Sequence, residues 1–379
     1  MRPLRIAIVH PYSWPAVRRG GERYLADLAW FLTTTGHQVD VITSRDGPAT
    51  RQAWRVRPVP SVAPGWLARR GVSAVETFGA SALGALLRRR YDVVHALTPS
   101  AAIAARLAGQ RTVYTVLGHP APELVERFSS LQRQLMARAV RSADVVAALS
   151  TPSAAAVQHA FGRAAHILPP GVRLDRFPLE PQPRLGPPRI LFPSFAANPH
   201  KGLGTLIDAL ALLRRVVPDA RLEIAGPGDA GWALDRADPA TRAAVDVLGV
   251  GDLDELPLRY ASAAVTALPS LYEAFGLVLV ESLACGTPVV CASTSSGSTD
   301  IVDHPAIGRA VPFADAGALA RALEETIVLA RDPVTPRRCR DHARRWDWEE
   351  AVGPAHSSLY RELTAASLRR NDRAGGNIP

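Results

Sequence analysis

Short runs of apolar, largely β-branched residues recur along the whole chain and alternate with helical patterns. Runs that are apolar at consecutive positions are typical of strands buried on both faces, as in parallel sheets. The clearest intervening helix covers residues 22–35, with Gly36 as its expected C-cap. The alternation predicts an α/β protein built from doubly wound parallel sheets. The expected strands are residues 6–9, 39–43, 93–97, 112–116, 145–149, 166–168, 190–192, 222–225, 245–248, 264–268, 289–291 and 310–312.

A proline-rich stretch divides this alternation into two parts. Residues 177–188 contain five prolines and one glycine, a composition typical of a semi-rigid linker. A chain of 379 residues is also long enough for two domains. We therefore expect a Rossmann-like domain over residues 1–178, a linker over 179–188 and a second Rossmann-like domain over 189–344, with a cleft between the domains. The polar tail, residues 366–379, is expected to be disordered.

The charge distribution narrows the range of partners. The net charge is +9, made up of +12 in residues 1–180 and −3 in residues 181–379. Such asymmetry is typical of a surface that meets phosphate or lipid headgroups, or it reflects an arginine-rich composition alone. Nucleic acid is not an expected partner, because the sequence has neither a recognition-fold signature nor aromatic residues interleaved with basic ones.

The cysteines and the apolar runs indicate the compartment. Cys285, Cys291 and Cys339 are odd in number and lack metal-ligand spacing, which favours reduced thiols. The first apolar run is too short for a secretory signal, and no run reaches the roughly 18 residues of a membrane span. We therefore expect a cytoplasmic protein.

Lys201 is the only lysine among the forty-four basic residues. It lies between an expected strand and a helical pattern at 203–213, a strand–loop–helix context that favours phosphate. Lysine supplies a compact, movable charge, whereas arginine presents a planar fork. The alternative is a chance escape from a biased codon supply.

The most specific segment, residues 269–290, predicts an anion site. A helix is expected from about Gly276 to a C-cap at Gly286. Its N-terminus presents the amides of Phe275, Gly276 and Leu277 with a partial positive charge, which suits a diphosphate.

Two acids flank this helix start. Glu281 lies inside the helix among apolar residues, where a carboxylate is costly unless it finds donors such as sugar hydroxyls. Glu273 lies outside, at the positive end. The structural alternative is that Glu273 caps the helix and Glu281 is a paired buried charge.

The spacing Glu273-x7-Glu281, with Ala-Phe-Gly after the first acid and Cys-Gly-Thr-Pro after the second, resembles the retaining nucleotide-sugar glycosyltransferases of family 4 (glycosyl transferases group 1). The resemblance covers nearly the whole chain. It extends to Gly20-Gly21-Glu22, Gly36-His37-Gln38-Val39, Pro170-Gly171-Val172, Lys201-Gly202 and a closing helix over residues 345–365 that crosses back to the first domain.

The resemblance implies a GT-B fold of two facing Rossmann-like domains and a metal-independent retaining transfer from a UDP- or GDP-sugar, with no cofactor. It places Lys201 at the donor phosphate, Glu273 at the sugar hydroxyls and Glu281 at the ribose hydroxyls. His119 would contact the donor sugar from the first domain. Gly20 and Gly21 would admit the acceptor or a phosphate, and Gly226 would lie beside the nucleobase. The acceptor is left open: lipid-linked, polysaccharide or small molecule.

One departure weakens the phosphate clamp. The family commonly has an arginine shortly before the lysine, whereas residues 194–197 and His200 fill those places here. A protonated His200 could partly substitute. A GT-B sugar-nucleotide epimerase and a non-catalytic sugar-nucleotide binder therefore stay open as alternatives.

Three weaker motifs are also present. Gly226-Pro-Gly228-Asp-Ala-Gly231 fits a dinucleotide pattern, but Pro227 compromises the helix that it should open. Asp252-Leu-Asp254 has metal-binding spacing but lies in an expected surface helix, so no metal is expected. The run Arg88–Arg90 ends a helix, where its positive charges stabilise the negative end of the helix dipole. Together with Trp66, Arg69 and Arg70 it could instead contact an anionic membrane, which would place the protein at the inner face of that membrane.

Overall fold

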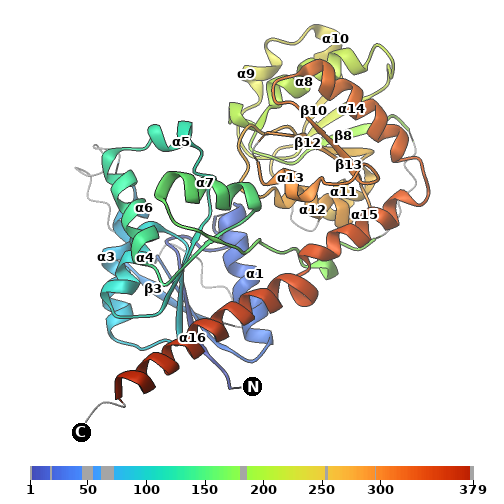
Figure 1. Cartoon of the computed structure of the whole chain (residues 1–379). Coiled ribbons are helices and arrows are strands. Elements are labelled where there is room, and N and C mark those ends of the chain that lie inside the picture. Colours follow the sequence, from blue (N-terminus) through green and yellow to red (C-terminus); the bar gives the residue numbers. More distant parts are fainter. Residues whose placement is uncertain are drawn as a thin grey trace. The chain divides into compact units, whose positions relative to one another are not determined.

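The computed structural model describes residues 2–17, 19–44, 54–60, 72–179, 186–251, 255–294 and 296–375 (Figure 1). The chain forms two compact units, Met1–Gly171 with Trp348–Pro379, and Val172–Asp347. The chain changes unit at Val172, whereas we expected the first domain to end at 178. The Val172 N–H donates to the Trp346 carbonyl over 2.8 Å, and Arg340 donates to the carbonyls of Leu174 and Phe177, so this segment is fastened to the second unit.

The first unit contains a seven-stranded parallel sheet in the order β3-β2-β1-β4-β5-β6-β7. In Figure 1, α3, α4 and α6 lie on one side of this sheet, and α1 and α16 lie on the other. Its strands are β1 (Arg5–Val9), β2 (Gln38–Ser44), β3 (Arg55–Val59), β4 (Val93–Ala96), β5 (Thr112–Val116), β6 (Val145–Ala148) and β7 (His166–Ile167). Its helices are α1 (Gly20–Thr34), α3 (Ala74–Leu87), α4 (Pro99–Leu107), α5 (Pro122–Glu126), α6 (Ser130–Ser142), α7 (Thr151–Phe161) and α16 (Gly353–Gly375).

The second unit contains a six-stranded parallel sheet in the order β10-β9-β8-β11-β12-β13. The core on one face packs α8 and α14 against the strands, while α11, α12 and α15 lie on the other side in Figure 1. Its strands are β8 (Arg189–Phe192), β9 (Arg221–Ile224), β10 (Val245–Val247), β11 (Val265–Leu268), β12 (Val289–Ala292) and β13 (Gly308–Val311). Its helices are α8 (Leu203–Leu213), α9 (Gly231–Leu234), α10 (Pro239–Arg242), α11 (Leu256–Ser262), α12 (Leu277–Ala284), α13 (Ser298–Ile301), α14 (Ala316–Leu329) and α15 (Thr335–Ala343).

The predicted fold class of two doubly wound parallel sheets is confirmed, and all twelve expected strands are present within a few residues of their predicted ends. One further strand was missed. Strand β3 reads Arg-Val-Arg-Pro-Val, so it shows no continuous apolar run, and it contains Pro58. Such a sequence is tolerated because β3 is an edge strand that pairs only with β2.

The closing segment returns the chain to the first unit. It begins with a π-helical turn, Trp348–Val352, and continues as α16. Trp348 stacks on Tyr24 at 6.1 Å. Two buried hydrogen bonds join α16 to α1 and to β4: Tyr24 Oη to His356 Nε2 at 2.7 Å, and Tyr360 Oη to His95 Nδ1 at 2.5 Å. We expected a helix over 345–365 and a disordered tail from 366. The helix instead starts later and runs to Gly375, since alanine, leucine and arginine follow Leu363 and favour helix.

Candidate functional site

Lys201 and Glu273, 72 residues apart in sequence, meet in the second unit. Lys201 Nζ donates to Glu273 Oε2 over 2.6 Å, and the two side chains are 22% and 17% exposed. Lys201 follows β8 and Glu273 follows β11, and these strands are neighbours in the sheet. The carboxyl ends of parallel strands form the edge where open α/β sheets bind ligands. Both residues therefore lie at the edge of the sheet where a ligand would bind.

Backbone contacts hold the two loops together. The Asn198 side chain accepts from the His200 N–H over 3.0 Å, and the His200 carbonyl accepts from the Leu271 N–H over 2.8 Å. Gly202 has a φ of 78°, and a Cβ on it would lie 2.1 Å from the Pro269 carbonyl oxygen. Only glycine allows this approach, so Gly202 sets the spacing between the lysine loop and the glutamate loop.

Helix α12 begins where the sequence predicted. Its N-cap, Gly276, has a φ of 104°, a left-handed conformation that glycine adopts readily. The Glu273 carbonyl accepts from the Gly297 N–H over 2.7 Å, which fixes the turn before the helix. Phe275 is buried with its ring 6.1 Å from that of Trp346, so its contribution to a ligand site is its backbone amide. Leu277 is the first residue of α12, so its amide also lies at the helix N-terminus.

Glu281 is only 2% exposed and has a donor within the protein. Tyr260 Oη, from α11, donates to Glu281 Oε2 over 2.7 Å. We expected this carboxylate either to find donors in sugar hydroxyls or to be a paired buried charge. The phenol was missed because nothing in the sequence links positions 260 and 281. The sequence indicated only that a buried carboxylate at Glu281 requires a hydrogen-bond partner, not which residue provides it.

The loop that departs from the family pattern carries an exposed aromatic ring. Phe195 is 46% exposed, and the neighbouring Ala196 N–H donates to the Pro227 carbonyl over 2.9 Å. A Cβ on Gly226 would lie 1.9 Å from the Ser194 carbonyl oxygen, so only glycine at 226 allows the loop after β9 to pack closely against the loop after β8. The first helix after the glycine pattern, α9, has four residues and starts at Gly231. This arrangement does not match a dinucleotide-binding turn, in which the glycines open a longer helix.

The first-unit residues gather after β5. His119 is buried, with Nδ1 3.1 Å from Ser153 Oγ, and burial lowers the pKa of its imidazole. Gly20 is the first residue of α1, and a Cβ on Gly21 would lie 3.0 Å from Leu117 Cδ1, so the start of α1 packs against the loop that leads to His119. The adjacent Glu22 is also buried, and burial raises the pKa of its carboxyl. The sequence patterns indicate Glu22 only as part of the glycine motif at the start of α1.

The arginine run that follows α3 makes specific contacts. Arg89 Nε lies 3.7 Å from Asp40 Oδ2, and Arg90 donates to the carbonyls of Ala108 and Gly109. We expected the run to interact with the dipole of its own helix, whereas Arg90 caps the C-terminal end of α4. Trp66, Arg69, Arg70, Asp252 and Asp254 lie outside the described residues.

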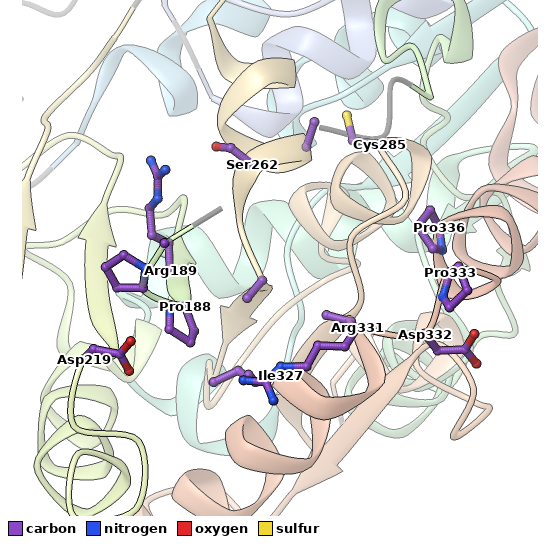
Figure 2. Close-up of a pocket in the computed structure, with 15 residues that line it drawn as sticks. Pro188, Arg189, Asp219, Ser262, Cys285, Ile327, Arg331, Asp332, Pro333 and Pro336 are labelled. Carbon is purple, nitrogen blue, oxygen red and sulfur yellow. The ribbon is translucent and has the colours of Figure 1, made fainter. Parts of the chain in front are cut away.

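A cavity of about 440 Å³ lies elsewhere in the second unit (Figure 2). Its lining includes Arg189, Asp219, Cys285 and Arg331. Arg189 is the first residue of β8, so the cavity lies at the amino edge of the sheet, opposite the edge that carries Lys201. Because ligands of open parallel sheets bind at the carboxyl edge, we place the candidate site at the loops and not at this cavity.

The sequence matches two family models. Residues 18–176 match "Glycosyltransferase Family 4", and residues 180–346 match "Glycosyl transferases group 1". A GDP-mannose-dependent alpha-(1-6)-phosphatidylinositol monomannoside mannosyltransferase of Mycolicibacterium smegmatis is 31% identical over 353 residues, covering 83% of this chain and 87% of that protein. A phosphatidyl-myo-inositol mannosyltransferase of Propionibacterium freudenreichii is 26% identical over 381 residues, covering 94% of each chain.

Solved structures support the same architecture. A sucrose-phosphate synthase from Thermosynechococcus elongatus superimposes with a TM-score of 0.77 at 22% identity, over 95% of this chain and 99% of that chain. At this identity the similarity shows the fold alone. None of the helices in the part of the chain that the structure describes is both long and apolar enough to cross a bilayer.

Proposed function

Because the chain belongs to glycosyltransferase family 4, we propose that it carries out a metal-independent retaining transfer in which the second unit binds the donor. The family assignment makes it a hexosyltransferase of GT-B fold that uses nucleotide-sugar donors. The observation that supports the proposal most is the Lys201–Glu273 pair at the carboxyl edge of the second sheet. It joins a cation, a carboxylate and the N-terminus of α12 in one place.

Each part of this group has a distinct role in the proposal. As the sugar–phosphate bond breaks, negative charge builds on the leaving diphosphate, and Lys201 with the amides near Gly276 stabilises it. Glu273 holds the lysine in place and accepts hydrogen bonds from the sugar hydroxyls. Glu281 accepts from the ribose hydroxyls. We propose that His119, whose imidazole pKa is lowered by burial, contacts the sugar, and that Gly20 and Gly21 leave room for the acceptor.

The donor and acceptor are proposed from the relatives. The two mannosyltransferases act on phosphatidylinositol-type lipids, and one is named as dependent on GDP-mannose. We therefore propose GDP-mannose as the first donor to test, ahead of UDP-sugars, and an inositol phospholipid as the acceptor. The net charge of +12 over residues 1–180 supports contact with an anionic membrane, which would bring the acceptor to a cytoplasmic enzyme.

Incubation of the full chain with labelled GDP- and UDP-sugars, with and without phosphatidylinositol vesicles, tests the proposal. Transfer with retained anomeric configuration supports it, and transfer with inversion contradicts it. Isomerised donor without transfer would establish the epimerase alternative. Saturable binding without turnover would establish the non-catalytic binder, which the absence of an arginine from residues 194–197 keeps in view. A thermal-shift screen with UDP, GDP and ADP identifies the nucleobase.

A further inference from the structure

Tyr260 and Glu281 form a buried pair beside the proposed donor site. Tyr260 is fully buried, Glu281 is nearly so, and the phenol oxygen lies 2.7 Å from Glu281 Oε2. Hydrogen bonds to a carboxylate are shorter and stronger than those between neutral groups, and removal from water strengthens them further. The pair therefore fixes the direction in which the carboxylate points.

The tyrosine is itself held from two sides. The Thr287 hydroxyl donates to the Tyr260 carbonyl over 2.6 Å, and the Tyr260 ring lies 6.3 Å from that of Phe177. The helix that carries Glu281 is braced in the same region. Ser282 Oγ donates to the Thr287 carbonyl over 3.1 Å and lies 2.8 Å from Thr266 Oγ1. Both members of the pair thus project from fixed backbone.

We propose that Tyr260 is a positioning residue for nucleotide recognition, which holds the Glu281 carboxylate in the orientation that accepts the ribose hydroxyls. This inference rests on the ribose role of Glu281 in the proposed function. A glutamate side chain has several rotatable bonds, and ordering them when the ligand binds would weaken binding. The hydrogen bond from Tyr260 orders the carboxylate beforehand. Tyr260 thereby contributes to the preference for ribonucleotides without touching the ligand.

A purely structural role makes a different prediction. If Tyr260 only satisfies a buried carboxylate, its loss lowers stability and weakens every nucleotide equally. If it positions Glu281, its loss weakens a ribonucleotide but not the counterpart without ribose hydroxyls. The measured quantity is therefore the ratio of affinities for a ribonucleotide and its 2′,3′-dideoxy counterpart. The ribonucleotide is whichever of UDP, GDP and ADP binds best.

Three variants of the full chain separate the outcomes. Tyr260→Phe should lower the ratio about tenfold, the effect of losing one hydrogen bond to a charged group, while dideoxynucleotide affinity stays unchanged. Glu281→Gln should remove most of the preference. Tyr91→Phe is the matched control, because Tyr91 donates to Asp40 over the same 2.7 Å in the first unit, and its ratio should equal that of the wild type.

The results distinguish this inference from the function on which it rests. If Glu281→Gln keeps the full preference, the ribose role fails. If Glu281→Gln loses it and Tyr260→Phe does not, only the positioning role fails. Should Tyr260→Phe not fold, 3-fluorotyrosine at position 260 of the otherwise wild-type chain provides the readout. Its ¹⁹F resonance should shift with the ribonucleotide and not with the dideoxynucleotide, and equal shifts with both overturn the inference.

Discussion

Replacing Lys201 by alanine should remove most of the turnover. The variant loses the cation that we place at the leaving diphosphate, and loss of one such preorganised charge-stabilising group typically lowers kcat about 10²–10³-fold. It also removes the ammonium group that lies 2.6 Å from Glu273 Oε2, so the Glu273 carboxylate loses its counter-charge. At an effective dielectric constant of about 20, a carboxylate and a phosphate charge about 5 Å apart repel each other by roughly 3 kcal/mol.

This second effect makes a double variant informative. In Lys201→Ala/Glu273→Gln the repulsion is gone, so its rate should exceed the product of the two single effects by about tenfold or more. Lys201→Arg should not restore the wild-type rate, because a longer planar fork cannot occupy the position of a compact ammonium in loops spaced by Gly202. Initial rates over a range of donor concentrations give kcat and KM for each variant.

The control is Arg221→Ala. Arg221 pairs with Asp246 at 2.7 Å in the same unit, but it opens β9 at the amino edge of the sheet, and exposed pairs contribute little. Its kcat should stay within about twofold of the wild type, the effect expected of a remote surface change. Wild-type turnover in Lys201→Ala, or strictly multiplicative effects in the double variant, would refute the assignment of the pair.

Three further predictions concern loop spacing, pH and lipid. Gly202→Ala should lower the free energy of unfolding by roughly 1–2 kcal/mol for the left-handed backbone, and further because of the clash with Pro269; it should also lower activity. The control is Gly36→Ala, which has a φ of 88° and nothing within 4 Å, so denaturant titrations should show only the loss for the left-handed backbone. Burial lowers the pKa of His356 to about 4, so the unfolded chain takes up its proton near pH 6.5 and the folded chain does not. The stability contributed by His356 should therefore be complete above pH 6.5 and should fall by up to about 3 kcal/mol towards pH 4, so the total fall should be smaller in His356→Gln; equal falls in the two proteins would contradict it. The protein should co-sediment with anionic vesicles at low salt and dissociate at high salt, and equal recovery with neutral vesicles would exclude an electrostatic contact.

Much of the fold follows from local patterns in the sequence. Strands buried on both faces leave continuous apolar runs, and Gly276 and Gly286 mark the two ends of α12 closely. A parallel sheet also brings Lys201 and Glu273 to one edge, because the loops after all of its strands reach the carboxyl edge, but their direct contact was not predicted. Edge strand β3 was not predictable in this way, since it needs no apolar run and tolerates Pro58.

Contacts between side chains on different helices and strands could not be predicted from the sequence patterns. Tyr260 and Glu281 lie on separate helices, and His95 and Tyr360 are 265 residues apart, so neither pair has a characteristic spacing. What local reasoning could provide was the requirement that a buried polar group finds a partner. Which partner it finds depends on helix packing.

The return of the chain to the first unit has a consequence for its synthesis. The second unit is one continuous stretch, residues 172–347, so all of its residues are available as soon as that stretch has been made. The first unit is discontinuous, because Trp348, His356 and Tyr360, which pack on its α1 side, are made only after the whole of the second unit. Until residues 348–360 have been made, the apolar surface of residues 1–171 that they cover has no partner in the chain. A truncation before residue 348 would leave the first unit permanently incomplete, so a fragment meant to represent it must carry residues 348–375 fused to residues 1–171.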